Sequence, residues 1–100
     1  MRAITRDAVN AFKLGYTFNR DNTTVHTTHK GELLYLFGNM IAHKEGNELF
    51  ITTCGYKTNT TKERLNGLLE VYNLPKIRSV KGVWFIGNEE WTEQRKIFKL

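Results

Sequence analysis

The first apolar pattern along the chain has the spacing of a helix. Apolar residues recur every three or four positions and form one stripe: Ile4, Ala8, Ala11 and Phe12. Thr5 is expected to cap this helix, with Asp7 in its first turn, and Gly15 is expected to end it. The pattern predicts a helix over about residues 6–14.

A second helical stripe lies in the other half of the chain. Its apolar positions follow i, i+3, i+4 and i+7: Leu65, Leu68, Leu69 and Tyr72. Thr60 and Glu63 have the spacing of a capping box, and Asn73 and Pro75 are expected to end the helix. Gly67 either weakens this helix, by about 1 kcal/mol if it is exposed, or lets another backbone approach closely.

Between the two helices the pattern becomes that of strands. Residues 23–28 are β-branched and polar, which favours an exposed or edge strand. Residues 33–37 are apolar on both alternating faces, which favours a central strand covered on both sides. After a turn at 44–47, residues 49–54 form the next strand. Short turns between such strands predict an antiparallel meander.

The pair Gly38-Asn39 leaves two interpretations open. It is either a bulge within one long strand or a tight turn between two strands. The apolar pattern continues through residues 40–42, so the bulge is favoured.

The end of the chain predicts a hairpin followed by a charged tail. Residues 76–80 alternate, residues 83–86 are apolar, and Lys81-Gly82 can turn the chain between them. Residues 89–100 are charged, with three apolar residues spaced loosely: Trp91, Ile97 and Phe98. This tail is either a short docking helix or a partly frayed end.

These elements predict a single α+β domain over residues 1–100. The order is an N-terminal helix, an antiparallel β-meander, a capped amphipathic helix and a C-terminal β-hairpin, with both helices on one face of the sheet. A hydrophobic fraction of 40% and a charged fraction of 25% agree with a folded globule. The predicted edge at residues 23–28 is either hydrated or paired with a second copy, which leaves a dimer open.

Cysteine and hydropathy indicate the compartment. The lone cysteine, Cys54, excludes an intramolecular disulfide and favours a reducing environment. A buried strand position is expected for Cys54 rather than a nucleophilic role. The N-terminus has no apolar run after its charges, so no secretory signal is expected. No apolar stretch approaches the ~20 residues of a membrane-spanning helix.

Positive charge is concentrated in the second half of the chain. The net charge is +5, and the sequence pI is about 9.5. Residues 1–50 carry six Lys and Arg against five Asp and Glu, whereas residues 51–100 carry nine against five. This excess either attracts phosphate or an acidic protein surface, or only keeps the domain in solution.

The second helix is one candidate binding surface. Lys62, Arg64 and Asn66 lie off its leucine stripe and are expected to face water, and Lys57 precedes the helix. Further anion contacts are expected at the free N–H groups of the helix start, beside Thr60 and Thr61. The alternative is that the capping box already satisfies those N–H groups and that Arg64 pairs with an acidic neighbour.

The other candidate binding surface combines two cations, Arg78 and Lys81, with two aromatic residues, Trp84 and Tyr56. Cations beside aromatic rings suit single-stranded nucleic acid. The alternative for Trp84 is a core position, because it lies within an apolar run.

The sequence contains no recognisable catalytic or cofactor constellation. His26 and His29 fall on opposite faces of a strand, no third ligand accompanies them, and the other histidine is His43. Glu89 and Glu90 are adjacent and read as a solvated face. No phosphate-binding loop or dinucleotide fingerprint occurs. We therefore expect no enzyme activity, no cofactor and no metal.

Several segments resemble a small domain of unknown function found in proteins of tailed bacteriophages. The resemblance runs from Leu34 to Trp91 and is carried by residues 36–42, 51–56, 58–68 and 81–85, of which Thr-Thr-Lys-Glu-Arg-Leu-Asn is the most specific run. The chain departs from that pattern at Phe37, where the family has histidine, and at Tyr56, where it has tryptophan. A catalytic histidine at position 37 is thereby excluded.

The resemblance implies a phage or prophage origin and expression inside a bacterial cell, and it implies no activity. The first hypothesis is a non-enzymatic phage accessory protein that binds nucleic acid in the host cytoplasm. The alternative is an inhibitor that docks on a host protein, such as a defence or transcription component. Neither hypothesis involves a membrane.

Overall fold

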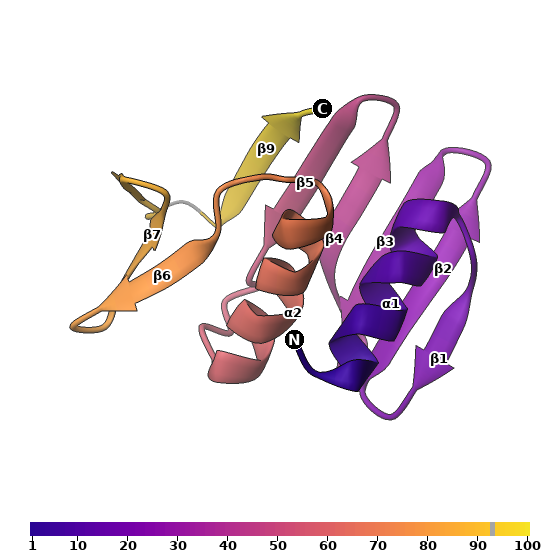
Figure 1. Ribbon diagram of the computed structural model, residues 1–100, viewed down its shortest axis with the longest axis horizontal. Coiled ribbons are helices and arrows are strands. Elements are labelled where there is room, and N and C mark those ends of the chain that lie inside the picture. The colour runs from indigo at the N-terminus through magenta and orange to yellow at the C-terminus, as the bar shows by residue number, and fades with distance from the viewer. Residues whose placement is uncertain (93) are drawn as a thin grey trace.

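Two helices lie on one face of a six-stranded antiparallel sheet in the computed structural model, which describes residues 1–92 and 94–100 (Figure 1). Helix α1 spans Ala3–Leu14 and helix α2 spans Asn59–Val71. The large sheet has the order β1-β2-β3-β4-β5-β9, and a small sheet of order β6-β7-β8 lies beside α2. The predicted α+β class, with both helices on one face, is confirmed.

The strands of the large sheet are β1 (Phe18–Arg20), β2 (Thr23–Thr28), β3 (Gly31–Leu36), β4 (Asn39–Glu45), β5 (Glu48–Thr52) and β9 (Arg95–Lys99). Those of the small sheet are β6 (Ile77–Val80), β7 (Val83–Ile86) and β8 (Glu89–Glu90). Strands β6 and β7 form the predicted C-terminal hairpin, with Val80 paired to Val83 across its turn.

The two apolar stripes of the sequence form the core. Phe12 of α1 and Leu65, Leu68 and Leu69 of α2 are completely buried. They face the apolar side chains that the large sheet turns toward the helices: Val25, Leu34, Leu36, Ile41, Leu49 and Ile51. Burying a leucine of this size contributes about 1.5–3 kcal/mol, so the stripes anchor both helices to the sheet.

The preferred bulge at Gly38-Asn39 is wrong, and the alternative turn is confirmed. Phe37 and Gly38 both have positive φ, +51° and +78°, as in the two-residue turns that suit β-hairpins. Leu36 and Asn39 pair across this turn, so one expected strand is two strands, β3 and β4. A register shift does occur, but it lies between Leu34 and Tyr35 on β3.

Strand β2 is paired on both sides over half of its length. It pairs with β3 as expected, but β1 pairs along its other side, with Phe18 opposite Val25. The predicted bare edge is therefore wrong for residues 23–25, whereas β1 does not extend along residues 26–28.

Both interpretations of the C-terminal tail are wrong. Residues 95–99 form strand β9, which pairs antiparallel with β5 and places Phe98 opposite Leu49. Residues 89–90 form β8, which pairs with β7. Without β9, the backbone groups of β5 would lie exposed at the sheet edge, and pairing with the tail satisfies them. Residue 93 of this tail lies outside the described residues.

Both expected helix caps are displaced. Thr5 lies inside α1 and is completely buried, because this helix begins at Ala3 and Arg2 is its N-cap. Helix α2 is capped by Thr58, whose hydroxyl accepts a hydrogen bond from the N–H of Thr61 at 3.1 Å. The predicted capping box at Thr60 is therefore wrong.

The predicted helix ends are confirmed. Gly15 closes α1 in the left-handed conformation, with φ +80°. Helix α2 stops at Val71, before Asn73, which has φ +56°.

The helices cover one face of the large sheet only (Figure 1). On the other face His26 meets the edge of Tyr35 at 5.4 Å between ring centroids, and His43 stacks on Phe50 at 6.0 Å. Leu33 and Tyr35 are therefore half-buried, and the expected cover on both sides of β3 is wrong. Across residues 1–92 and 94–100, no three His, Cys, Asp or Glu side chains gather as a metal site would require.

Cys54 is exposed, so the expectation of a buried strand cysteine is wrong. Strand β5 ends at Thr52, and Cys54 lies in the following turn with φ +53°. Its Sγ–H donates a hydrogen bond to the carbonyl of Met40 at 2.8 Å. Neither described helix is long and apolar enough to cross a membrane.

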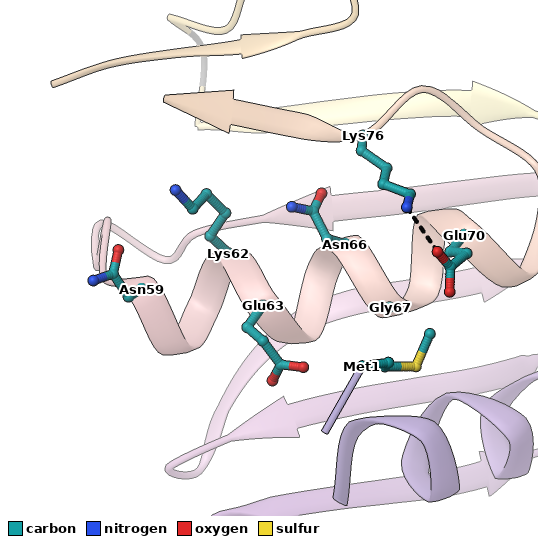
Figure 2. A pocket seen from close by; sticks show the side chains of 8 residues that line it. All are labelled: Met1, Asn59, Lys62, Glu63, Asn66, Gly67, Glu70 and Lys76. Carbon is teal, nitrogen blue, oxygen red and sulfur yellow. Dashed lines mark hydrogen bonds and ion pairs between the residues drawn. The ribbon is translucent and has the colours of Figure 1, made fainter. Parts of the chain in front are cut away.

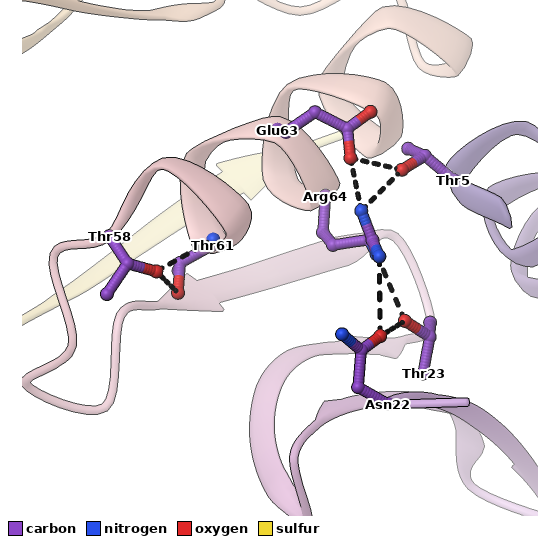
Figure 3. A network of polar contacts seen from close by, with 7 residues as sticks. All are labelled: Thr5, Asn22, Thr23, Thr58, Thr61, Glu63 and Arg64. Atoms are coloured by element: carbon purple, nitrogen blue, oxygen red, sulfur yellow. Dashed lines mark hydrogen bonds and ion pairs between the residues drawn. The ribbon is translucent and has the colours of Figure 1, made fainter. Parts of the chain in front are cut away.

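One buried polar network joins both helices to the turn between β1 and β2 (Figure 3). Arg64 is 2% exposed, and its Nε donates to the hydroxyl of Thr23 at 3.0 Å. Its Nη1 donates to Thr5 Oγ1 at 2.9 Å and to Glu63 Oε1, and its Nη2 donates to Asn22 Oδ1 at 3.3 Å. A buried guanidinium is tolerated only when its charge and donors are satisfied in this way.

Gly67 permits the two helices to approach closely. A Cβ at this position would lie 2.3 Å from Cγ2 of Thr5 and 3.5 Å from Cγ1 of Val9. Thr5 has little freedom to move away, because its hydroxyl is hydrogen-bonded to Arg64 and Glu63. Close approach, the second interpretation of Gly67, is confirmed, although a side chain rather than a backbone makes the contact.

We expect Gly67→Ala to destabilise the domain. Overpacking costs about 1–3 kcal/mol, which exceeds the gain of about 1 kcal/mol from the better helix propensity of alanine. The measurement is urea denaturation followed by circular dichroism. Thr5→Ser keeps the hydroxyl and removes the clashing methyl group, so Gly67→Ala should cost less in that background. Equal costs in both backgrounds would contradict the proposed contact.

We expect Arg64→Ala to lower the free energy of unfolding by about 3–5 kcal/mol, because it leaves Glu63 and three other polar groups without their partner. Since Glu63 is partly exposed, the loss in free energy of unfolding should lie toward the lower end of this range. Lys62→Ala is the matched control on the same helix, with an expected change of about 0.5 kcal/mol or less. Similar losses for the two variants would show that the network contributes little.

Candidate nucleic-acid interface

Three of the predicted binding residues serve the fold instead. Arg64 points inward, so the expectation that it faces water is wrong. Thr61 is buried, and its hydroxyl lies 3.0 Å from that of Thr58. Asn66 bonds the backbone of Ile77 on both sides, accepting from its N–H at 2.7 Å and donating to its C=O at 2.9 Å. Asn66 thereby ties β6 to α2 and is not free for a ligand.

Four predicted cations remain near the β6–β7 hairpin, and we name them the hairpin cations: Lys57, Lys62, Arg78 and Lys81. Within residues 1–92 and 94–100 none of them forms a salt bridge. The neighbouring Lys76 is different, since its Nζ lies 2.7 Å from Glu70 Oε1. The hydrogen bond and charge of Lys76 lower the pKa of Glu70, which favours the carboxylate that pairs with Lys76.

Lys62 projects from the same side of α2 as Asn66, toward the small sheet (Figure 2). The spacing i, i+4 puts the two residues on one helix face, and Asn66 fastens that face to β6. Glu63 points the other way, toward α1 (Figure 2). The groove beside these residues, of about 470 Å³, also contains the Lys76–Glu70 pair, whereas Lys62, which lines it too, forms no salt bridge with a described residue.

Two hairpin cations lie over one tryptophan. The Nζ atoms of Lys57 and Lys62 lie 5.3 Å and 5.9 Å from the ring centroid of Trp84. The ring itself is 6% exposed and packs against Trp91, so the alternative of a core position for Trp84 is confirmed. Cation–π attraction holds both ammonium groups beside the small sheet.

Arg78 lies on the opposite face of the hairpin. Its guanidinium carbon is 4.6 Å from the ring centroid of Phe85, its cross-strand partner. The Nε also donates to the carbonyl of Gly87 at 3.1 Å. The expected group of Arg78 with Trp84 is therefore not formed, and Phe85, which the sequence analysis did not select, takes that place.

Lys81 occupies the hairpin turn with φ +52°, as the predicted Lys81-Gly82 turn requires. It is exposed at the tip of the β6–β7 hairpin, which extends away from the large sheet (Figure 1). The tip adds a fourth cation without bringing it into contact with the others.

Thr60 and Tyr56 line a separate hollow of about 390 Å³, between the β3–β4 turn and the start of α2. We name it the α2-start hollow. Phe37 also lines it, and Leu36 and Ile41 are its buried apolar residues. Sequence reasoning named Thr60, Thr61 and Tyr56 but did not bring them together with Phe37, because these residues come from segments that are distant along the chain. Phe37 itself was assigned to a central strand, so nothing in the sequence marked its ring as exposed.

Residues 1–99 match the model of a family described as Kyanoviridae Gp96 protein. The chain belongs to this family. The Kyanoviridae Gp96 proteins are proteins of tailed phages that infect cyanobacteria, so the expected phage origin is confirmed. No curated protein and no solved structure matches the chain.

Proposed function

We propose that this protein is a non-enzymatic accessory protein of the phage that binds single-stranded nucleic acid in the host cytoplasm. The observation that carries the proposal is the set of hairpin cations, four positive side chains with no acidic partner among the described residues. Phosphate groups are the partner such cations attract most strongly, and they supply most of the affinity in non-specific binding.

The aromatic neighbours make these cations better phosphate contacts. Lys57 and Lys62 rest on Trp84, and Arg78 rests on Phe85 and bonds Gly87. A side chain already held in place loses less conformational entropy when a ligand arrives. A guanidinium plane on an aromatic ring is also a surface on which an unpaired base can stack, which favours single strands over duplex.

A second function is favoured by one observation. Val80 and Val83 pair across the hairpin beside Arg78 and are 44% and 37% exposed. An apolar pair flanked by cations also suits an acidic host protein, as an inhibitor would require. The two functions differ in what they need: nucleic-acid binding does not require the valines, whereas docking on a protein does.

We expect the protein to bind a labelled single-stranded oligonucleotide with a strong dependence on salt. Four single-strand phosphate contacts give a slope of about −3 for log K against log salt, or about a 50-fold loss between ~50 and ~200 mM. Arg78→Glu with Lys81→Glu should weaken binding about tenfold or more and flatten the slope by about 1.4. Fluorescence anisotropy at several salt concentrations measures both quantities.

The matched control is Lys30→Glu with Lys44→Glu, which makes the same change in net charge at the far end of β3 and β4. These lysines belong to the β2–β3 turn and to β4, away from the small sheet. We expect this control to retain most of the affinity. Absence of binding at ~50 mM salt, or equal losses in the two double variants, would refute the nucleic-acid proposal.

A further inference from the structure

We propose that the α2-start hollow holds one unstacked base of the bound strand. This inference rests on the proposed function and deepens it, because it adds a base-binding site to a surface that otherwise contacts phosphate. The hollow has a volume of about 390 Å³, within the range of small-ligand sites. Its lining combines aromatic, apolar and hydroxyl side chains, which are the groups that recognise a planar heterocycle with polar edges.

Two aromatic side chains at the hollow are unusually exposed. Phe37 is 70% exposed and Tyr56 is 57% exposed, and they come from two separate turns. Both line the hollow above the buried side chains of Leu36 and Ile41. Exposed rings over an apolar floor can stack on a base of any identity, as single-strand binding proteins do.

The backbone at Phe37 supports a functional role for its ring. The turn requires φ of +51° there, a conformation that suits glycine and asparagine and is unfavourable for a bulky aromatic residue. The phenyl ring is exposed, so packing within the domain does not offset that cost. Backbone strain that internal packing does not offset is characteristic of binding sites, where the strained residue contacts a ligand.

The polar groups of the hollow fit the rest of a nucleotide. Asn39 and Thr60 line it and offer an amide and a hydroxyl to a base edge or a sugar. Thr58 and Thr61 also line it, at the positive end of the dipole of α2. A phosphate that follows the bound base would therefore meet a favourable field.

The hollow adjoins one of the hairpin cations, Lys57. Thr53 lines both the α2-start hollow and a neighbouring hollow of about 330 Å³ that Lys57 and Trp84 also line. The short loop that contains Tyr56 and Lys57 contributes to the lining of both hollows. A strand whose phosphates bind the hairpin cations can cross this loop and place its next base against Phe37 and Tyr56.

The test compares a single-stranded oligonucleotide of about ten residues with a fully abasic oligonucleotide of equal length and charge. Phe37→Asn keeps the turn favourable, since asparagine accepts the left-handed conformation, and Tyr56→Ser alters an exposed loop. Each variant should weaken binding of the normal oligonucleotide by about 5–150-fold, the value of one stacked base. Neither variant should change the affinity for the abasic strand or the slope against salt.

Tyr16→Ser is the matched control, because Tyr16 is a similarly exposed aromatic residue, 64%, just beyond α1. It should leave both affinities unchanged. If both variants bind the normal strand as tightly as the unaltered protein, the base site is refuted while phosphate binding by the hairpin cations stands. The same holds if the unaltered protein binds normal and abasic strands equally.

If no oligonucleotide binds, the proposed function fails, and a nucleoside monophosphate then tests the hollow alone. Backbone amide shifts of Thr60 and Thr61 in nuclear magnetic resonance spectra, absent with ribose 5-phosphate, would support base binding. Absence of shifts at millimolar nucleotide would refute it. A melting temperature equal to or above that of the unaltered protein will show that Phe37→Asn is folded.

Discussion

The buried guanidinium of Arg64 is the interaction on which the architecture depends. Its hydrogen bonds reach Thr5 in α1, Glu63 in α2, and Asn22 and Thr23 beside the β1–β2 turn. A charge removed from water is costly unless each of these partners is in place, so the network determines where the helices lie relative to each other and to the sheet. The same placement brings Thr5 against α2 at a point where only glycine leaves room.

The direction of Arg64 also determines what α2 presents to solvent. Successive residues of a helix are about 100° apart, so Lys62, two positions before Arg64, projects from nearly the opposite side. That side is the one that Asn66 fastens to β6, and it places Lys62 over Trp84. One orientation of α2 therefore buries Arg64 and places Lys62, the proposed phosphate contact, toward solvent.

The sequence predicted what local periodicity controls and failed where distant residues decide. The leucine stripe of α2 and the β6–β7 hairpin follow from spacing and turn residues, and both are confirmed. Arg64 was misplaced because its hydroxyl partners lie 41 and 59 residues away along the chain. The tail was misread because β9 pairs with β5, and short alternating segments give little signal without their partner. Of the candidate site, the four cations and Trp84 were named from the sequence, but Phe85, the ring that holds Arg78, was not.

The turn at Phe37-Gly38 was missed for a different reason. The residue at position 37 is not the one that would best stabilise the turn. A turn of this kind favours asparagine before Gly38. Because phenylalanine stands there instead, the usual sequence signal of the turn is missing. Sequence rules describe what stabilises a fold, so they fail where a residue serves another purpose. Arg64 breaks the rule that cations face water but is compensated by its network. Phe37 breaks the turn rule with its ring 70% exposed, and the proposed base contact would give that exposed ring its use.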